Sequence, residues 1–301
     1  MIVVGGGLGG ISAGAALARL GKSVLLVEEQ HAPGGYARSI DREGYRFDPA
    51  IHYTSQGNEG ELLDVYLKLL GIRDRVSFVT STQEYGVQFP GLRATLPAGV
   101  EPFIEENARQ FPEHADGVRK FFQLCVDATR ESQQATQRLS LRELDQAVTQ
   151  LPLLFRYRMA SVDDVLDELV ADPQARGLCG AIWPYVGSPP SRASFMVYAG
   201  LLTSTLETGP VYCRGSFQSL ADAFVAAIEE NGGEVVLGRR VTRIDVDGGR
   251  VAGVELEDGR RPRADVVVSN ADARQAYEEL IEWHKQIQFH SNANEGKREQ
   301  S

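Results

Sequence analysis

The amino-terminal residues combine two short apolar runs with a glycine-rich turn between them. Residues 2–4 are apolar and β-prone, and they lead directly into the turn GGGLGG at residues 5–10. An alanine- and leucine-rich stretch follows and ends at Leu20-Gly21, which is typical of a helix with a glycine C-cap. Residues 23–28 (SVLLVE) form a continuous apolar run with an acidic end, the pattern of a parallel strand covered on both faces. The sequence therefore predicts a complete βαβ unit at the start of the chain.

The pattern changes between residues 83 and 208. Short strand-like runs give way to helical stretches at residues 101–138 and 161–170, and Ser161 with Asp164 forms the signature of a capping box. The apolar run at residues 194–209 is compatible with a substrate tunnel or with an ordinary buried helix. We interpret residues 83–208 as a mainly helical insertion.

The pattern returns to alternating strands and turns after this insertion. Residues 215–233 have the spacing of an amphipathic helix closed by glycines, and the strands that follow predict an antiparallel β-meander that returns to a central strand. The last twenty residues are polar and have no clear period. The predicted organisation is an FAD-binding domain in two halves, residues 1–82 and 209–281. A substrate or cap domain, residues 83–208, lies between the halves, and residues 282–301 form an irregular tail.

Composition excludes several kinds of partner. The formal net charge is −10, with 41 acidic and 31 basic residues, so no wide basic surface for nucleic acid is expected. The three cysteines are far apart and lack metal-site spacing, and we expect no metal. The first basic residue is Arg19, and no apolar run approaches the roughly 18 residues that span a bilayer. We expect a cytoplasmic protein, and leave peripheral contact with a membrane open.

A dinucleotide fingerprint lies in the amino-terminal βαβ unit. Gly5-x-Gly7-x-x-Gly10 follows the first predicted strand and opens the helix, and Glu28 ends the next strand. Gly7 would let the backbone approach a pyrophosphate at the amino terminus of the helix, and Glu28 would accept hydrogen bonds from the adenosine ribose. The charge of Glu28 disfavours the 2′-phosphate of NADP. The alternative is a glycine-rich turn that only packs tightly.

A second glycine pair distinguishes a predicted FAD site from an NAD site. Gly34-Gly35 lies shortly after Glu28, and Arg38 and the stretch GYRFDPAIHY follow it. This order resembles the flavin amine oxidase superfamily, and within it the phytoene desaturase, carotenoid isomerase and retinol saturase family of FAD-dependent oxidoreductases. The stretch from Val211 to Asp272 is similar to the family's second conserved stretch. The resemblance implies an α/β fold, in which a Rossmann-type FAD/NAD(P)-binding domain is interrupted by the mainly helical substrate domain, with FAD as cofactor.

The resemblance also implies roles for individual residues. Val241 would meet the adenine through its backbone, and Asn270-Ala271 would close the dinucleotide site. His52 would lie near the isoalloxazine ring and steer or protonate the substrate; a histidine satisfied by backbone groups or stacked in the core is the alternative. The expected cofactor-binding residues are Gly5, Gly7, Leu8, Gly9, Gly10, Glu28, Glu29, Gly34, Gly35, Arg38, Val241, Asn270 and Ala271.

The implied activity is an FAD-dependent oxidation or reduction of C=C or CH–CH bonds in a hydrophobic, carotenoid- or retinoid-like polyene, by hydride transfer through the flavin. An amine oxidase-like flavoprotein with a polar substrate remains an alternative, as does an inactive nucleotide-binding remnant. Family members commonly carry another glycine-rich flavin motif near the carboxyl end, and this sequence lacks it. We therefore expect a chain truncated at its C-terminus. The substrate, the direction of reaction, the electron acceptor and the oligomeric state stay open.

Overall fold

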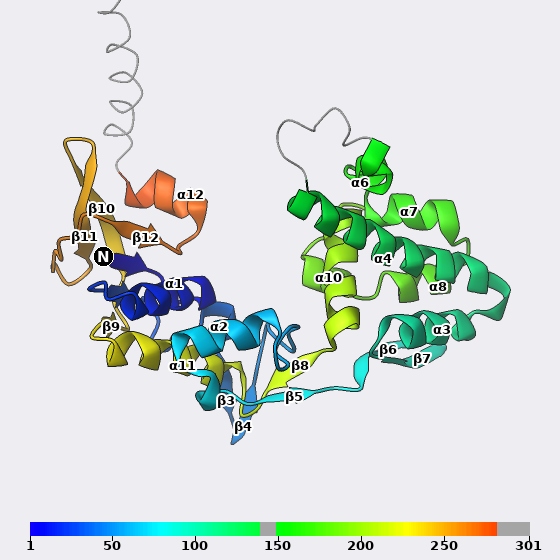
Figure 1. Cartoon of the computed structure of the whole chain (residues 1–301), viewed down its shortest axis with the longest axis horizontal. Helices are drawn as coiled ribbons and strands as arrows, with labels where there is room; N and C mark the ends of the chain where they lie inside the picture. The colour runs from blue at the N-terminus through cyan, green and yellow to red at the C-terminus, as the bar shows by residue number, and fades with distance from the viewer. Residues whose placement is uncertain (139–148, 282–301) are drawn as a thin grey trace, which may run out of the picture. The chain divides into compact units, whose positions relative to one another are not determined.

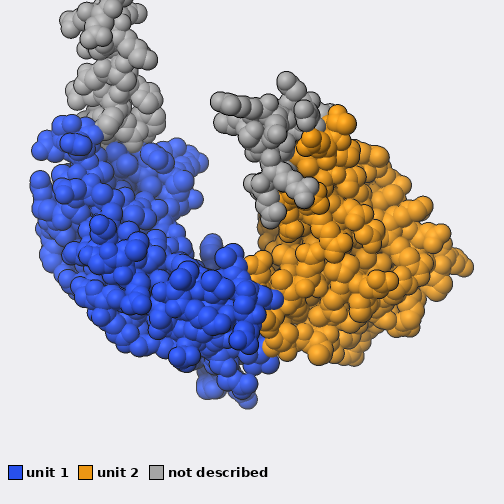
Figure 2. All heavy atoms as spheres, viewed as in Figure 1, with its two compact units in different colours: residues 1–53, 59–79, 212–301 blue, residues 54–58, 80–211 orange. Residues whose placement is uncertain are grey.

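The computed structural model describes residues 1–138 and 149–281, which form two compact units. Unit 1 contains residues 1–53 and 59–79 and the chain from residue 212 onward, and unit 2 contains residues 54–58 and 80–211 (Figure 2). The predicted tail, residues 282–301, lies outside the described residues. The assignment of residues 83–208 to a substrate domain stays a prediction.

A four-stranded parallel sheet forms the centre of unit 1. Its strands lie in the order β12, β1, β2, β9, and β1 pairs with both β2 and β12. Figure 1 shows β12 beside the blue strand at the N-terminus. Val3 and Leu26 are fully buried, as expected for strands covered on both faces. The predicted α/β fold of the Rossmann type is confirmed. The strand bounds are β1 (Ile2–Val4), β2 (Leu25–Val27), β9 (Glu234–Val236) and β12 (Val267–Ser269).

Helices α1 (Leu8–Arg19) and α11 (Phe217–Glu230) pack closely against each other in unit 1. A Cβ atom on Gly14 would lie 2.9 Å from Cδ1 of Ile228, so the helices touch where α1 has no side chain. Helix α2 (Leu62–Leu70) buries Leu67 and Leu70. Leu62, the first residue of this helix, is 73% exposed. It lies seven residues before the exposed Leu69, and this spacing puts both leucines on the opposite face.

Two antiparallel hairpins accompany the parallel sheet in the described part of unit 1. Strands β3 (Ile40–Arg42) and β4 (Tyr45–Phe47) pair antiparallel, as do β10 (Val241–Asp247) and β11 (Arg250–Leu256). Residues 260–264 return along β11 through backbone hydrogen bonds and complete the predicted meander. Residues 234–236 were expected to begin this meander, but they pair with β2 and join the parallel sheet.

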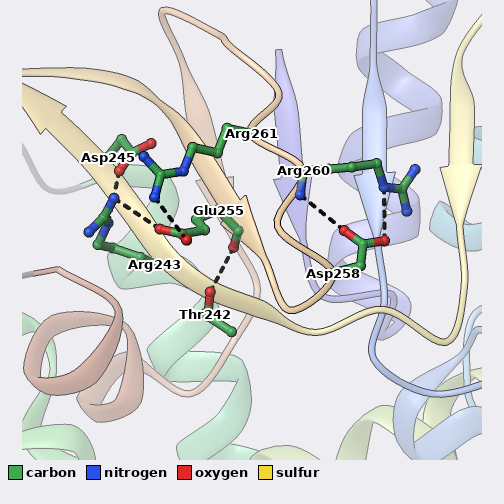
Figure 3. Close-up of polar contacts among 7 residues, drawn as sticks. All are labelled: Thr242, Arg243, Asp245, Glu255, Asp258, Arg260 and Arg261. Atoms are coloured by element: carbon green, nitrogen blue, oxygen red, sulfur yellow. Dashed lines mark hydrogen bonds and ion pairs between the residues drawn. The ribbon is translucent and has the colours of Figure 1, made fainter.

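Ion pairs connect the strands of the meander (Figure 3). Arg243 lies 2.9 Å from both Asp245 and Glu255, and Arg261 lies 3.0 Å from Glu255. These pairs join β10, β11 and the returning segment across one surface. The short elements of unit 1 are η1 (Gly35–Ala37), η2 (Arg73–Arg75), α12 (Ala273–Gln275) and the π-helical turn η4 (Ala276–Leu280).

Unit 2 is mainly helical, with one antiparallel hairpin of β6 (Gln83–Phe89) and β7 (Leu92–Pro97). The predicted helix at 101–138 is divided by the 3₁₀ turn η3 (Pro112–His114), because proline cannot continue a preceding helix. Strands β5 (Phe78–Thr80) and β8 (Val211–Cys213) pair where the chain passes between the units. The helices of unit 2 are α3 (Val100–Gln110), α4 (Ala115–Arg138), α6 (Pro152–Tyr157), α7 (Val162–Leu169), α8 (Pro173–Cys179), α9 (Trp183–Val186) and α10 (Phe195–Thr208).

An aromatic cluster forms the core of unit 2. The rings of Phe103, Phe121 and Phe122 meet edge to face, with centroids 5.0 and 5.3 Å apart, and Phe195 and Tyr198 of α10 pack on the same cluster. The capping box of α7 is confirmed, since the Asp164 amide donates to the Ser161 hydroxyl at 3.1 Å. The apolar face of α10 is therefore occupied by packing inside unit 2.

A buried carboxylate in unit 1 gives a test of the packing around α2. Asp64 is 1% exposed, accepts the Gly60 amide at 2.8 Å and pairs with Lys68 and Arg73. These partners hold the pKa of Asp64 well below its usual range. A lowered pKa stabilises the folded state above the unfolded pKa of about 4, and this stabilisation is lost as the pH falls.

We expect the Asp64→Asn variant to melt several degrees below the parent at pH 7, because an amide cannot satisfy the same donors. The gap should narrow as the pH falls below about 4. Thermal melts followed by circular dichroism, in buffers from about pH 2.5 to about pH 7, measure this difference in melting temperature. A gap that stays constant with pH contradicts the assigned role of this carboxylate.

Candidate functional site

A cavity of about 530 Å³ lies within unit 1, at the carboxyl ends of β1, β2 and β12. This edge of a parallel sheet is the usual ligand site of doubly wound α/β proteins. Ligand pockets of about 300–1,000 Å³ accommodate small molecules and cofactors. The predicted residues that line the cavity are Gly5, Gly7, Leu8, Glu28, Glu29, Gly34, Gly35, Val241, Asn270 and Ala271.

The first glycine loop, residues 5–10, carries the chain from β1 into α1. Gly5 has φ +95°, a left-handed conformation that glycine adopts without strain. A Cβ on Gly10 would lie 1.9 Å from the carbonyl oxygen of Gly5, so the helix begins directly against the turn. Within the described chain α1 has neither a side-chain cap nor an acidic residue in its first turn. Its first N–H groups and its dipole suit an anionic ligand.

The second glycine loop, residues 33–39, lies against the first. The Gly34 amide donates to the carbonyl of Gly6 at 2.7 Å, and Gly7 and Gly34 form a parallel β-bridge. Gly35 has φ +57°, and a Cβ there would lie 3.0 Å from the Cα of Gly7. The two loops therefore meet backbone to backbone, and the part of the cavity wall that they form at Gly7 and Gly35 has no side chains.

Glu28 closes the other side of the first loop from the end of β2. It is 8% exposed; its Oε2 accepts the Gly6 amide at 2.5 Å, and its Oε1 accepts the Gln30 amide at 2.8 Å. Each carboxylate oxygen has two lone pairs, so both retain capacity for a ligand hydroxyl. A fixed, buried acceptor beside the cavity is the group that a ribose diol requires.

Asn270 reaches the same loop from the end of β12. Its backbone amide donates to the Val4 carbonyl at 2.7 Å. Its side-chain amide lies over α1, since a Cβ on Gly7 would come within 2.9 Å of Nδ2 and one on Gly9 within 2.6 Å of Oδ1. Asn270 thus places a polar amide at the amino terminus of α1, from a position more than 250 residues away in the sequence.

Two arginines of the cavity were missed by the sequence analysis. Arg239 and Arg240 both line it, immediately before Val241. The Arg239 amide donates to the Glu28 carbonyl at 2.9 Å, and its side chain reaches Asp258 at 3.2 Å. Arg240 lies 4.0 Å from Glu29. Their position beside Val241 was the available signal, but only the tertiary fold brings this segment to the acidic end of β2.

The other predicted residues lie beside the cavity. Gly9 and Gly10 belong to α1, and the Arg38 guanidinium donates to Oε1 of Gln30 at 3.1 Å. His52 is exposed and does not line the cavity, although its neighbour Ile51 does. The catalytic role of His52 stays a prediction. Among the described residues, histidine, cysteine and acidic side chains form no cluster that could hold a metal ion.

Residues 8–295 match the family of flavin containing amine oxidoreductases. Human all-trans-retinol 13,14-reductase is 27% identical over 299 residues; the match covers 93% of this chain and 48% of that protein. Phytoene desaturase (lycopene-forming) from Paracoccus sp. is 28% identical over 285 residues, covering 93% and 56%. The PF1083 protein from Pyrococcus furiosus shares the fold with a TM-score of 0.63 at 21% identity, covering 93% and 60%. The chain thus spans about half the length of these curated relatives.

The contact between Gly10 and Gly5 predicts a specific sensitivity to substitution. We expect Gly10→Ala to cost about 1–3 kcal/mol and to lower the melting temperature by roughly 5 °C, because the new methyl group overlaps a backbone oxygen that cannot move independently. Gly200→Ala is the matched control, since a Cβ on this glycine of α10 meets nothing within 4 Å. Differential scanning calorimetry compares the two. Equal melting temperatures for both variants would contradict the geometry of the loop.

Proposed function

Because the chain belongs to the flavin-containing amine oxidoreductase family, we propose that it binds FAD in the cavity of unit 1 and acts as an FAD-dependent oxidoreductase on a hydrophobic polyene. The bond that changes is a C=C or CH–CH bond. The meeting of the two glycine loops at the amino terminus of α1 is the observation that carries the cofactor assignment. An NAD-dependent dehydrogenase would not need the second loop.

The residues around the cavity fit the parts of FAD. The side-chain-free wall at Gly7 and Gly35 provides the close approach that a pyrophosphate requires, and the first turn of α1 supplies N–H donors. Glu28 would accept hydrogen bonds from the adenosine ribose. Val241 would meet the adenine through its backbone, and the Asn270 amide would lie beside the pyrophosphate. Arg38 is assigned to the ribityl side, by analogy with the family.

When bound, FAD supplies the redox chemistry, with hydride transfer at flavin N5. The chain's own residues bind and orient the cofactor. Ile51 lines the cavity with an apolar side chain, which would limit the access of water to the cofactor. His52, next to Ile51, would steer or protonate the substrate, since a ring N–H can donate a hydrogen bond or a proton.

The substrate class rests on the relatives, which are named for a retinol and for a carotenoid precursor. The apolar residues of α10 do not identify a substrate tunnel, because they pack in the core of unit 2. Among the described residues no helix has the length and apolar character needed to cross a bilayer. We propose that the protein takes a polyene from a membrane surface by peripheral contact, since such a substrate partitions into lipid.

Two other functions are distinguishable by experiment. An amine oxidase-like flavoprotein would share the cofactor site and act on a polar amine. A truncated, inactive remnant would bind a nucleotide without turnover. The family supports the cofactor of the amine oxidase alternative as well as that of the polyene oxidoreductase, and the named relatives favour the polyene as substrate.

FAD binding is the first prediction of this proposal. The purified chain, incubated with FAD and freed of excess, should show flavin absorbance, and Gly7→Val should lose it because the new side chain fills the wall of the cavity and meets the Asn270 amide. Gly200→Ala should keep the flavin. A folded but colourless parent chain contradicts the assignment of the cavity to FAD.

The substrate class is the second prediction. The flavin-loaded protein, incubated with a retinoid or carotenoid precursor and an artificial electron donor or acceptor, should change the absorbance spectrum of the polyene. An aliphatic diamine such as putrescine should leave the bound flavin oxidised under anaerobic conditions. Reduction of the flavin by the amine, with an unchanged polyene, would favour the amine oxidase alternative.

A further inference from the structure

The Gln218 side chain on α11 spans the second glycine loop of unit 1. Its Nε2 donates to the carbonyl oxygen of Pro33 at 3.1 Å, and its Oε1 accepts the amide of Ser39 at 3.4 Å. Pro33 and Ser39 are the first and last residues of the loop. One amide group therefore holds both ends of the segment that contains Gly34 and Gly35.

Helix α11 also contacts the middle of the loop. A Cβ on Gly34 would lie 3.1 Å from the Cβ of Ala221, so the helix surface reaches the glycine directly. Ala221 lies three residues after Gln218, which places the two side chains on the same face of the helix. Phe217 and Leu220 are buried and fix this helix in the core of unit 1.

Gln218 is itself oriented by a neighbour one turn along the helix. Its Nε2 also donates to Oδ1 of Asp222 at 2.9 Å. A glutamine amide has two N–H donors and one carbonyl acceptor, and all three functions are used here. The amide is therefore held with its donor toward Pro33 and its acceptor toward Ser39.

The far end of the loop is fixed by a second set of contacts. The Ser39 hydroxyl donates to Asp48, and the Tyr212 hydroxyl donates to the other Asp48 oxygen at 2.6 Å. The bond to the Asp48 carboxylate raises the pKa of Tyr212 to about 12, so the phenol remains a donor at neutral pH. Ser39 thus links the Gln218 contact to the segment that leads to Ile51 at the cavity.

We infer that Gln218 is a positioning residue for the cofactor site, although it does not line the cavity. It holds residues 33–39 so that Gly35 meets Gly7 and the side-chain-free wall forms. The expected effect of Gln218 on FAD binding rests on the proposed function, whereas its effect on the loop does not depend on FAD. A substitution at Gln218 should loosen the loop first and weaken cofactor binding as a result.

The test uses Gln218→Met, which keeps the length of the side chain and removes its hydrogen-bonding groups. Gln123→Met is the matched control, because Gln123 makes the same contact with a residue one turn later, to Asp127 at 2.9 Å on α4. Amide hydrogen exchange is measured on the whole chain without FAD, and the dissociation constant of FAD is measured by flavin fluorescence.

Gln218→Met should exchange its amides at residues 34–39 about tenfold faster than the parent, with unchanged exchange in α1, and should bind FAD about tenfold more weakly. Gln123→Met should match the parent in both measurements. Unchanged exchange at residues 34–39 in Gln218→Met overturns the inference. If the parent binds FAD, an equal FAD affinity of Gln218→Met and the parent overturns it as well.

Failure of the proposed function gives a different result. If the parent binds no FAD, the exchange comparison alone decides whether Gln218 holds the loop. If Gln218→Met does not fold, the exposed Asp222→Ala variant decides, since Asp222 accepts the hydrogen bond that orients Gln218. Faster exchange confined to residues 34–39 then supports the inference, and unchanged exchange overturns it.

Discussion

The close approach of two stretches of backbone is the constraint on which unit 1 depends. Gly7 and Gly35 come so near that a single Cβ on Gly35 would lie 3.0 Å from the opposite Cα. Around this contact, β1 and β2 pair in parallel, α1 begins, and the Gly34 amide bonds to Gly6. A side chain at the contact would separate the loops and displace the start of α1 together with the wall of the cavity. Sheet, helix and site therefore share one steric requirement.

The cavity has a polarity that follows from this arrangement. Backbone N–H groups gather at the amino terminus of α1, which favours negative charge, whereas Glu28 and Glu29 lie at the end of β2, which favours neutral hydroxyls. Arg239 and Arg240 offset the acidic end, in a chain whose net charge is −10. An elongated ligand with one anionic region and one diol region is oriented by these two ends.

The local pattern predicted the residues whose chemistry is local. Gly5, Gly10 and Glu28 follow from a strand, a turn and a helix within 28 residues, and the capping box at Ser161 follows from two side chains three positions apart. Val241 and Asn270 needed the family resemblance, because no local pattern brings them to the cavity. Gln218 and the arginines before Val241 were missed, since their partners lie up to 211 positions away in the sequence (239 − 28), and periodicity carries no information on such contacts.

The pairing of β1 with β12 joins Ile2 to Val267, residues 265 positions apart (267 − 2). At about 5–20 residues per second, a ribosome makes β12 roughly 10–50 s after β1. One edge of β1 therefore waits for its partner while all of residues 80–211 are synthesised, and an unpaired strand edge is a template for association with other chains. During this interval, chaperones that cover the unpaired edge of β1 would increase the yield of folded protein.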